Sequence, residues 1–201
     1  MITIVDYSVN NLRSVQKALE FLGHKTQVSH DPDTIAQASK LVLPGVGAFG
    51  EAMKNLRSKE LVDPIVETVT RGVPVLGVCL GMQLLFDWSE ELGLHQGLGI
   101  VSGKVVKFPD QPGLKVPHMG WSTLEFPRPS RLFQGLSSGM MTYFVHSYHV
   151  QPEDGSVVAA TCWHGQEFVA GIERENVMGA QFHPEKSSKT GLNILDNFGH
   201  L

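Results

Sequence analysis

The segment from Val73 to Gln83, VPVLGVCLGMQ, restricts the possible fold of this chain more than any other. An apolar run ends on Cys79, which stands between Gly77 and Gly81, and a helix-like sequence follows. Small neighbours allow a strained turn from strand to helix that exposes a nucleophile, as in the G-x-S-x-G elbow. We therefore predict that Cys79 is a nucleophile at a helix start, where free backbone N–H groups can receive an oxyanion.

Length, charge and cysteine content limit the class of protein. The 201 residues, 42% of them hydrophobic, suffice for one domain with a sizeable core. A net charge of -4 without a run of basic residues gives no electrostatic indication of nucleic-acid binding. No apolar run approaches the roughly 20 residues that span a bilayer, so we expect no membrane segment. Cys79 and Cys162 lie in separate apolar segments and the chain begins strand-like, so we expect a cytoplasmic protein without a targeting sequence.

Hydrophobic patterning divides the chain into two halves. The first half alternates short apolar runs with helical periodicity, which is typical of βαβ units. It predicts strands at residues 2–5, 25–29, 40–43 and 73–78, and helices at 11–22 and 61–71. After residue 93 we expect antiparallel strands at 103–108, 122–126, 141–145, 157–162, 168–173 and 177–181, and a closing helix at 190–198. The predicted fold is a single α/β domain over residues 1–201, with a mostly parallel central sheet flanked by helices and an additional antiparallel β region in the second half.

A base for the thiol is predicted near the carboxyl end of the chain. Catalytic thiols pair with a histidine that a third group orients, and these groups come from distant parts of a sequence. The segment FHPE at 182–185, which contains His183, directly follows the apolar run 177–181, so His183 is expected at a strand end. Pro184 fixes the backbone, and the Glu185 carboxylate can reach the imidazole and set its tautomer. Cys79, His183 and Glu185 therefore form a candidate triad.

These motifs resemble those of a known family. GVCLGMQ at 77–83 and FHPE at 182–185 match, in order, the two signatures of class I (triad) glutamine amidotransferases. Four further blocks are LPGVG at 43–47, VPHMGW at 116–121, YFVHSY at 143–148 and FHPEKSS at 182–188. They are similar to the glutaminase subunit of imidazole glycerol phosphate synthase, from histidine biosynthesis. The resemblance covers essentially the whole chain.

The resemblance implies hydrolysis of glutamine to glutamate and ammonia. Cys79 would attack the amide carbon and form a thioester, while His183 moves the protons and Glu185 orients it. For the oxyanion, the implied donors are the backbone of Leu80 and of the glycine-rich loop at Val46 and Gly47. For glutamine recognition, the implied residues are Gln83, Glu91, Ser147 and Tyr148.

The implied partner is a (β/α)8-barrel cyclase subunit, bound as a heterodimer. It would use the ammonia on a phosphoribosyl-formimino intermediate, giving imidazole glycerol phosphate and an aminoimidazole carboxamide ribotide. Because ammonia in water is mostly ammonium at neutral pH, we expect a sealed channel between the two active sites. The residues that resemble interface positions of the family are Asn11, Trp121, Tyr143 and Lys186. The amidase half needs no metal and no organic cofactor.

Other classes remain as alternatives. An amidotransferase subunit that serves anthranilate, carbamoyl phosphate or guanylate synthesis would share the elbow and FHPE but should lack VPHMGW. A cysteine hydrolase with a similar elbow need not carry FHPE, and a non-catalytic adaptor need not keep the triad. His146 and His149 stand three apart, as metal-binding histidines do on a helix. They fall where a strand runs into a loop, without a cysteine or carboxylate pattern, so we expect no metal there.

Overall fold

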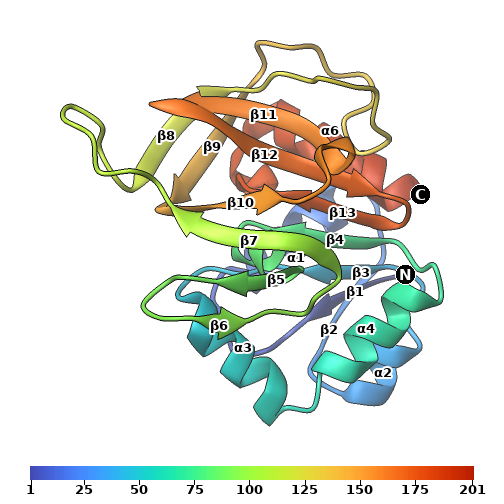
Figure 1. Cartoon of the computed structure of the whole chain (residues 1–201). Coiled ribbons are helices and arrows are strands. Elements are labelled where there is room, and N and C mark those ends of the chain that lie inside the picture. The colour runs from blue at the N-terminus through green and yellow to red at the C-terminus, as the bar shows by residue number, and fades with distance from the viewer.

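The computed structural model describes residues 1–201 and is built around a seven-stranded sheet in the order β11-β12-β13-β4-β3-β1-β2 (Figure 1). Its strands are β1 (Ile2–Val5), β2 (Thr26–Ser29), β3 (Leu41–Leu43), β4 (Val75–Val78), β11 (Val158–His164), β12 (Gln166–Arg174) and β13 (Val177–Ala180). The five strands from β13 to β2 are parallel, and β12 and β11 extend the sheet in antiparallel pairing. The α/β class with a mostly parallel central sheet is confirmed.

One prediction about this sheet held on only one side of a strand. The run 177–181 was expected in the antiparallel region, and β13 pairs antiparallel with β12, but on its other side it runs parallel to β4. All four residues of β13 are buried, as are all four of β4. A strand that is apolar on both faces is typical of the interior of a parallel sheet. The correction brings the segment that ends β13 next to the segment that ends β4.

Helices cover both faces of the sheet. They are α1 (Leu12–Phe21), α2 (Pro32–Ala36), α3 (Phe49–Ser58), α4 (Val62–Thr70), α5 (Leu80–Leu84) and α6 (Ser188–His200), with short 3-10 turns η1 (Gly155–Val157) and η2 (Pro184–Lys186). The helices expected at 11–22, 61–71 and 190–198 are present, whereas α2 and α3 were not predicted. On β3, Leu41 and Leu43 join the core cluster that includes α3, and Val42 joins the cluster that includes α1 and α6. This alternation follows from the period of two along a strand.

Two smaller sheets carry the rest of the second half. One has the order β10-β7-β5-β6 and consists of β5 (Phe86–Ser89), β6 (His95–Gln96), β7 (Val101–Lys107) and β10 (Tyr148–Pro152). The other pairs β8 (His118–Thr123) with β9 (Met141–His146) in antiparallel fashion. The strand expected at 122–126 therefore begins four residues earlier, because β8 starts with His118, Met119 and Gly120, residue types that do not mark a strand on their own.

The fold gathers three loops at one edge. Strands β3, β4 and β13 are parallel neighbours, so their carboxyl ends lie together. The segments that follow them contain the glycine-rich loop at 44–47, Cys79 and His183. In parallel sheets, sites form outside the carboxyl ends of the strands. No helix of the chain has the length and apolarity needed to cross a bilayer.

Candidate active site

Cys79 occupies the predicted elbow between β4 and α5. Its φ is 53° and its ψ is -111°, a strained conformation for a residue with a side chain. Its N–H donates to the Ala180 carbonyl at 2.7 Å, which holds the turn against β13. A Cβ atom at Gly77 would lie 2.7 Å from the Met82 backbone, and one at Gly81 would collide with the Leu43 carbonyl. The two glycines therefore allow the close approach of the helix to the strand ends.

His183 and Glu185 form a buried pair. His183 Nδ1 donates to Glu185 Oε1 at 2.8 Å, and both side chains are fully buried. Burial of the imidazole opposes its charge, but hydrogen bonds with Cys79 and Glu185 and the charges of both raise the pKa of His183 to about 10. Burial likewise opposes charge on Glu185, yet the bond to His183 and its charge lower the pKa of that carboxyl. The other ring nitrogen, His183 Nε2, is buried without a nitrogen or oxygen partner. His183 Nε2 is therefore free to exchange a proton with the Cys79 thiol. The pairing with Glu185 favours the charged forms of both the imidazole and the carboxylate.

Asn11 supports this pair from the start of α1. Its Nδ2 donates to Glu185 Oε1 at 2.6 Å. Its φ is 80°, and its side chain does not cap the helix it precedes. Asn11 was predicted at a partner interface, and the structure gives it a contact with the carboxylate of the pair. Sequence spacing carries no signal of this contact because 174 positions separate the two residues.

A cavity of about 200 Å³ adjoins the thiol. Its lining residues are Val46, Gly47, Cys79, Leu80, Gln83, Glu91, Val145, His146, Ser147 and Tyr148. Every residue predicted for the oxyanion and for glutamine recognition lies in this lining. The volume is below the range of pockets for drug-sized molecules and suits a small polar ligand. The structure therefore brings these residues together around the sulfur.

Some of the polar groups in this cavity already have partners in the protein. Gln83 Nε2 donates to the Tyr148 carbonyl at 2.9 Å and to Gln181 Oε1 at 3.1 Å. Glu91 Oε2 accepts the Phe49 N–H at 2.6 Å and so caps the start of α3. These bonds fix the positions of the Gln83 amide and the Glu91 carboxylate at the cavity wall.

Sequence reasoning missed Gln181. Its side chain is fully buried, and its Nε2 donates to Cys79 Sγ at 3.8 Å. Because β13 is parallel to β4, the residue after β13 lies beside the thiol that follows β4. The available signal was a polar residue within an apolar run, two positions before His183.

The backbone N–H predicted as the first oxyanion donor already has a partner within the protein. Leu80 N–H, the first predicted donor, donates to the Gly45 carbonyl at 3.3 Å. Gly45 belongs to the glycine-rich loop that was expected to supply the second donor. The loop thus presents a carbonyl acceptor to Leu80, where the prediction placed a backbone donor.

The remaining predicted interface residues surround this edge. Lys186 is exposed directly after Glu185, and Trp121 is 49% exposed. Tyr143 is half-buried with its ring centroid 6.0 Å from that of Trp121. The Tyr143 carbonyl accepts the His183 N–H at 2.9 Å, and its N–H donates to Ser187 Oγ at 2.9 Å. Strand β9 therefore helps to hold the histidine loop.

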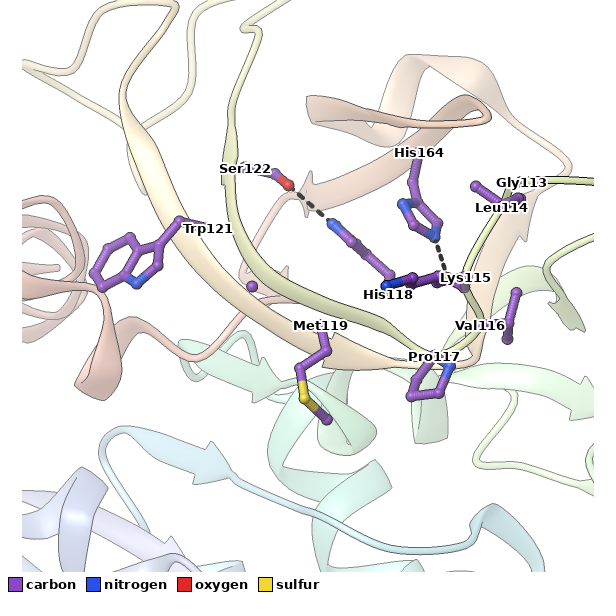
Figure 2. Close-up of a pocket in the computed structure, with 11 residues that line it drawn as sticks. Gly113, Leu114, Lys115, Val116, Pro117, His118, Met119, Trp121, Ser122 and His164 are labelled. Atoms are coloured by element: carbon purple, nitrogen blue, oxygen red, sulfur yellow. Dashed lines mark hydrogen bonds between the residues drawn. The ribbon is translucent and has the colours of Figure 1, made fainter.

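A larger cavity, about 1010 Å³, lies elsewhere, and Cys79 is not among its lining residues (Figure 2). It is lined by residues 113–122 and His164. His118 stacks on His164 with ring centroids 4.2 Å apart, and its ring nitrogens lie 2.9 Å from Ser122 Oγ and 3.2 Å from His146 Nε2. Burial, with the charge of His164 adding to it, lowers the pKa of His118 to about 4. This ring is neutral at pH 7 and has a packing role.

One group of side chains has the spacing to hold a metal ion. Ligand atoms of His24, Asp196 and His200 lie within 4.8 Å of one another. His24 Nε2 and Asp196 Oδ1 already pair at 2.9 Å, and Lys40 bonds the Gly199 carbonyl beside them. His200 is the last residue of α6, whereas His183 and Glu185 precede the first residue of that helix. This group is therefore separate from the thiol site in sequence. His146 and His149 do not belong to this group.

The fold and the thiol site define the class of protein. A family model described as "Glutamine amidotransferase class-I" matches residues 3–200. The structure also resembles PurLQS from Thermotoga maritima, with a TM-score of 0.77 at 18% identity over 98% of this chain and 96% of the other. It resembles the glutaminase domain of Trypanosoma brucei CTPS with a TM-score of 0.67 at 14% identity over 99% and 93%. At such identities the structural likeness concerns the fold.

Sequence relatives narrow the class further. "Imidazole glycerol phosphate synthase subunit HisH" from Syntrophotalea carbinolica is 56% identical over 206 residues, covering 100% of both chains. The subunit of the same name from Moorella thermoacetica is 52% identical over 200 residues, covering 100% of this chain and 94% of the relative. The chain belongs to the class I glutamine amidotransferase family and, within it, to the HisH subunits of imidazole glycerol phosphate synthase.

Proposed function

We propose that Cys79, His183 and Glu185 hydrolyse the side-chain amide of glutamine, and that the ammonia passes to a (β/α)8-barrel cyclase subunit held in a heterodimer. The observation that carries this proposal is the buried His183–Glu185 pair at 2.8 Å beside a thiol that opens on a polar cavity. Both cysteines are free, and a nucleophilic thiol persists in the reducing cytoplasm, where we place the protein.

The chemistry follows from the charges of the site. The Cys79 thiolate attacks the amide carbon, and the carbonyl oxygen takes the negative charge. The tetrahedral intermediate then collapses as His183 Nε2 gives its proton to the departing nitrogen, which leaves as ammonia. Water, deprotonated by the same nitrogen, attacks the thioester and releases glutamate and the thiolate. Glu185 keeps the imidazole oriented and stabilises its charge at each step.

Glutamine recognition is assigned to the cavity wall. The Glu91 carboxylate has a second oxygen for the α-amino group, because only Oε2 is used by the Phe49 N–H. The backbone at Ser147 and Tyr148 borders the same cavity and is assigned to the α-carboxylate. Gln83 Oε1 is an acceptor, since its Nε2 is used within the protein. An acidic group, amide donors and an acceptor around about 200 Å³ suit one free amino acid.

The oxyanion loop gives the isolated chain a resting arrangement. The Gly45 carbonyl uses the Leu80 N–H, so a developing oxyanion would meet an acceptor instead of a donor. Rotation of the peptide between Gly45 and Val46 would free Leu80 N–H and turn Val46 N–H toward the thiol. Glycine permits this rotation at low cost. We assign the energy for it to binding of the cyclase subunit.

An apolar surface beside the site supports a protein partner. Residues opposite one another in an antiparallel pair share a face, so Trp121 and Tyr143 lie on one side of the β8–β9 sheet with Met119 and Val145. Met119 is 63% exposed and Trp121 is 49% exposed, and both lie on the side of β8 away from the His118–His164 stack (Figure 2). Val145 lines the thiol cavity. The apolar face is therefore continuous with the site, as a sealed route for ammonia requires.

Trp121→Ala should weaken binding of the cyclase subunit by about 30-fold, because a central tryptophan in an interface contributes about 2 kcal/mol. Titration calorimetry with the purified cyclase measures the change. Trp163→Ala is the matched control, since Trp163 is 69% exposed on β11 and outside the proposed face. Equal affinities of the two variants would remove the β8–β9 face from the interface.

The proposed function is tested by glutamate release from glutamine, with and without the cyclase subunit and its ligand. We expect the rate of glutamate release to rise at least about 10²-fold in the complex, because one oxyanion donor typically changes kcat by at least this factor. A chain that is fully active alone would contradict the resting arrangement. If glutamate release is not stimulated by this cyclase but is stimulated by the synthetase of another amidotransferase, the proposed partner is wrong.

A further inference from the structure

Tyr7 is a buried polar residue that the mechanism does not use. It follows β1, its side chain is fully buried, and it does not line the cavity beside the thiol. Its hydroxyl donates to the carbonyl of Pro44, where the glycine-rich loop leaves β3. Burial, with the negative charge of Cys79 adding to it, raises the pKa of Tyr7, so its hydroxyl is a permanent donor.

The glycine-rich loop after β3 is anchored at both ends by side chains from other parts of the chain. At its start, Tyr7 bonds the Pro44 carbonyl. At its end, the Phe49 N–H donates to Glu91 at 2.6 Å. Between these two anchors stands Gly45, whose carbonyl occupies Leu80 N–H at 3.3 Å. The peptides between these two anchors make no hydrogen bond with a side chain.

We propose that Tyr7 is a positioning residue for the oxyanion hole, because it fixes Pro44 and so confines the rearrangement to the peptides between Gly45 and Ala48. This inference rests on the proposed function. With Pro44 fixed, rotation of the next peptide exchanges the Gly45 carbonyl for the Val46 N–H at one defined place. Without the hydroxyl, the buried Pro44 carbonyl loses its partner and the preceding peptide can turn as well. The donor would then be spread over several orientations, and preorganised donors are what stabilise an oxyanion.

Tyr7→Phe removes the hydroxyl and keeps the ring. In the complex with the cyclase subunit, we expect kcat for glutamate release to fall about 10-fold. This is less than the effect of losing an oxyanion donor altogether, because the donor remains but is less well oriented. KM for glutamine should stay within about twofold, because the residue does not touch the cavity. The rate of Cys79 alkylation by iodoacetamide should not change, because displacement at a saturated carbon forms no oxyanion. A merely structural defect would alter this alkylation or KM together with kcat.

Thr68→Val is the matched control. The Thr68 hydroxyl is also buried and bonds the carbonyls of Ile35 at 3.0 Å and Pro64 at 2.7 Å, on a helix that does not meet the thiol. Its kcat should equal that of the wild type. Tyr7→Met is a second variant, because it also removes the hydroxyl and fills the buried position with a flexible apolar side chain. It should lower kcat with unchanged alkylation, and it covers the case in which Tyr7→Phe does not fold.

Three outcomes would overturn the role of Tyr7: wild-type kcat in Tyr7→Phe, wild-type kcat in Tyr7→Met, or slower alkylation in parallel with kcat. Each is judged against a wild-type complex that releases glutamate. Absence of turnover in that wild-type complex would instead contradict the proposed function. The two failures are therefore distinguished in one set of assays.

Discussion

Cys79→Ala will lower glutamine hydrolysis by at least about 10⁴-fold while leaving ammonia-dependent synthesis by the cyclase subunit intact. Loss of a catalytic nucleophile removes the covalent route, and what remains is the modest effect of the oxyanion hole and substrate binding. The substitution trims one buried atom at a residue that is 5% exposed, so the fold and the partner surface should persist. Glutamate release and product formation from ammonium salts, measured on the same complex, separate the two halves of the reaction.

Cys162→Ala is the control for this experiment. Cys162 is buried on β11, and burial raises the pKa of its thiol to about 11, so it is inert at neutral pH. Its removal should leave glutamate release at the wild-type level. Glutamine turnover that survives in Cys79→Ala would exclude the thioester route. Loss of synthesis from ammonium would instead contradict the expectation that the substitution leaves the fold and the partner surface intact.

Features encoded within a few residues could be predicted from the sequence. The elbow at Cys79 depends on Gly77 and Gly81, each two residues from the cysteine, and Glu185 is two residues from His183. Strands β1, β3 and β4 were predictable because they are short, mainly apolar runs that are buried on both faces. That Cys79 and His183 meet was predicted from the need of a catalytic thiol for a base and from the family resemblance, whereas the run 177–181 was expected in the antiparallel region.

Features set by a distant contact or by one rotation could not be predicted. Asn11 reaches Glu185 across 174 positions, and Tyr7 reaches Pro44 across 37. Gln181 lies beside the thiol only because β13 is parallel to β4, which its own sequence does not reveal. The direction of the Gly45 carbonyl depends on backbone angles that glycine leaves open. Local propensity contains none of this information.

Glu185→Gln should lower glutamate release on the order of 10³-fold, although its shape is nearly that of the natural residue. Glu185 Oε1 accepts two hydrogen bonds, from His183 Nδ1 at 2.8 Å and from Asn11 Nδ2 at 2.6 Å. A glutamine with its oxygen in that place keeps both bonds but loses the charge that stabilises the imidazolium. In the opposite orientation its amide group faces two donors and forces the wrong tautomer of the imidazole.

The variant should also shift the pH dependence of kcat/KM in a defined direction. His183 must be protonated to give its proton to the leaving nitrogen, so activity falls as pH rises through the pKa of His183. Burial lowers that pKa, and the bonds and charges of Cys79 and Glu185 raise it to about 10. Removing the carboxylate charge lowers it, so the alkaline fall of activity should move to lower pH. Glu175→Gln, on an exposed turn after β12, is the control and should retain the wild-type profile. An unchanged alkaline limb in Glu185→Gln would mean that the carboxylate does not set the charge of the catalytic imidazole.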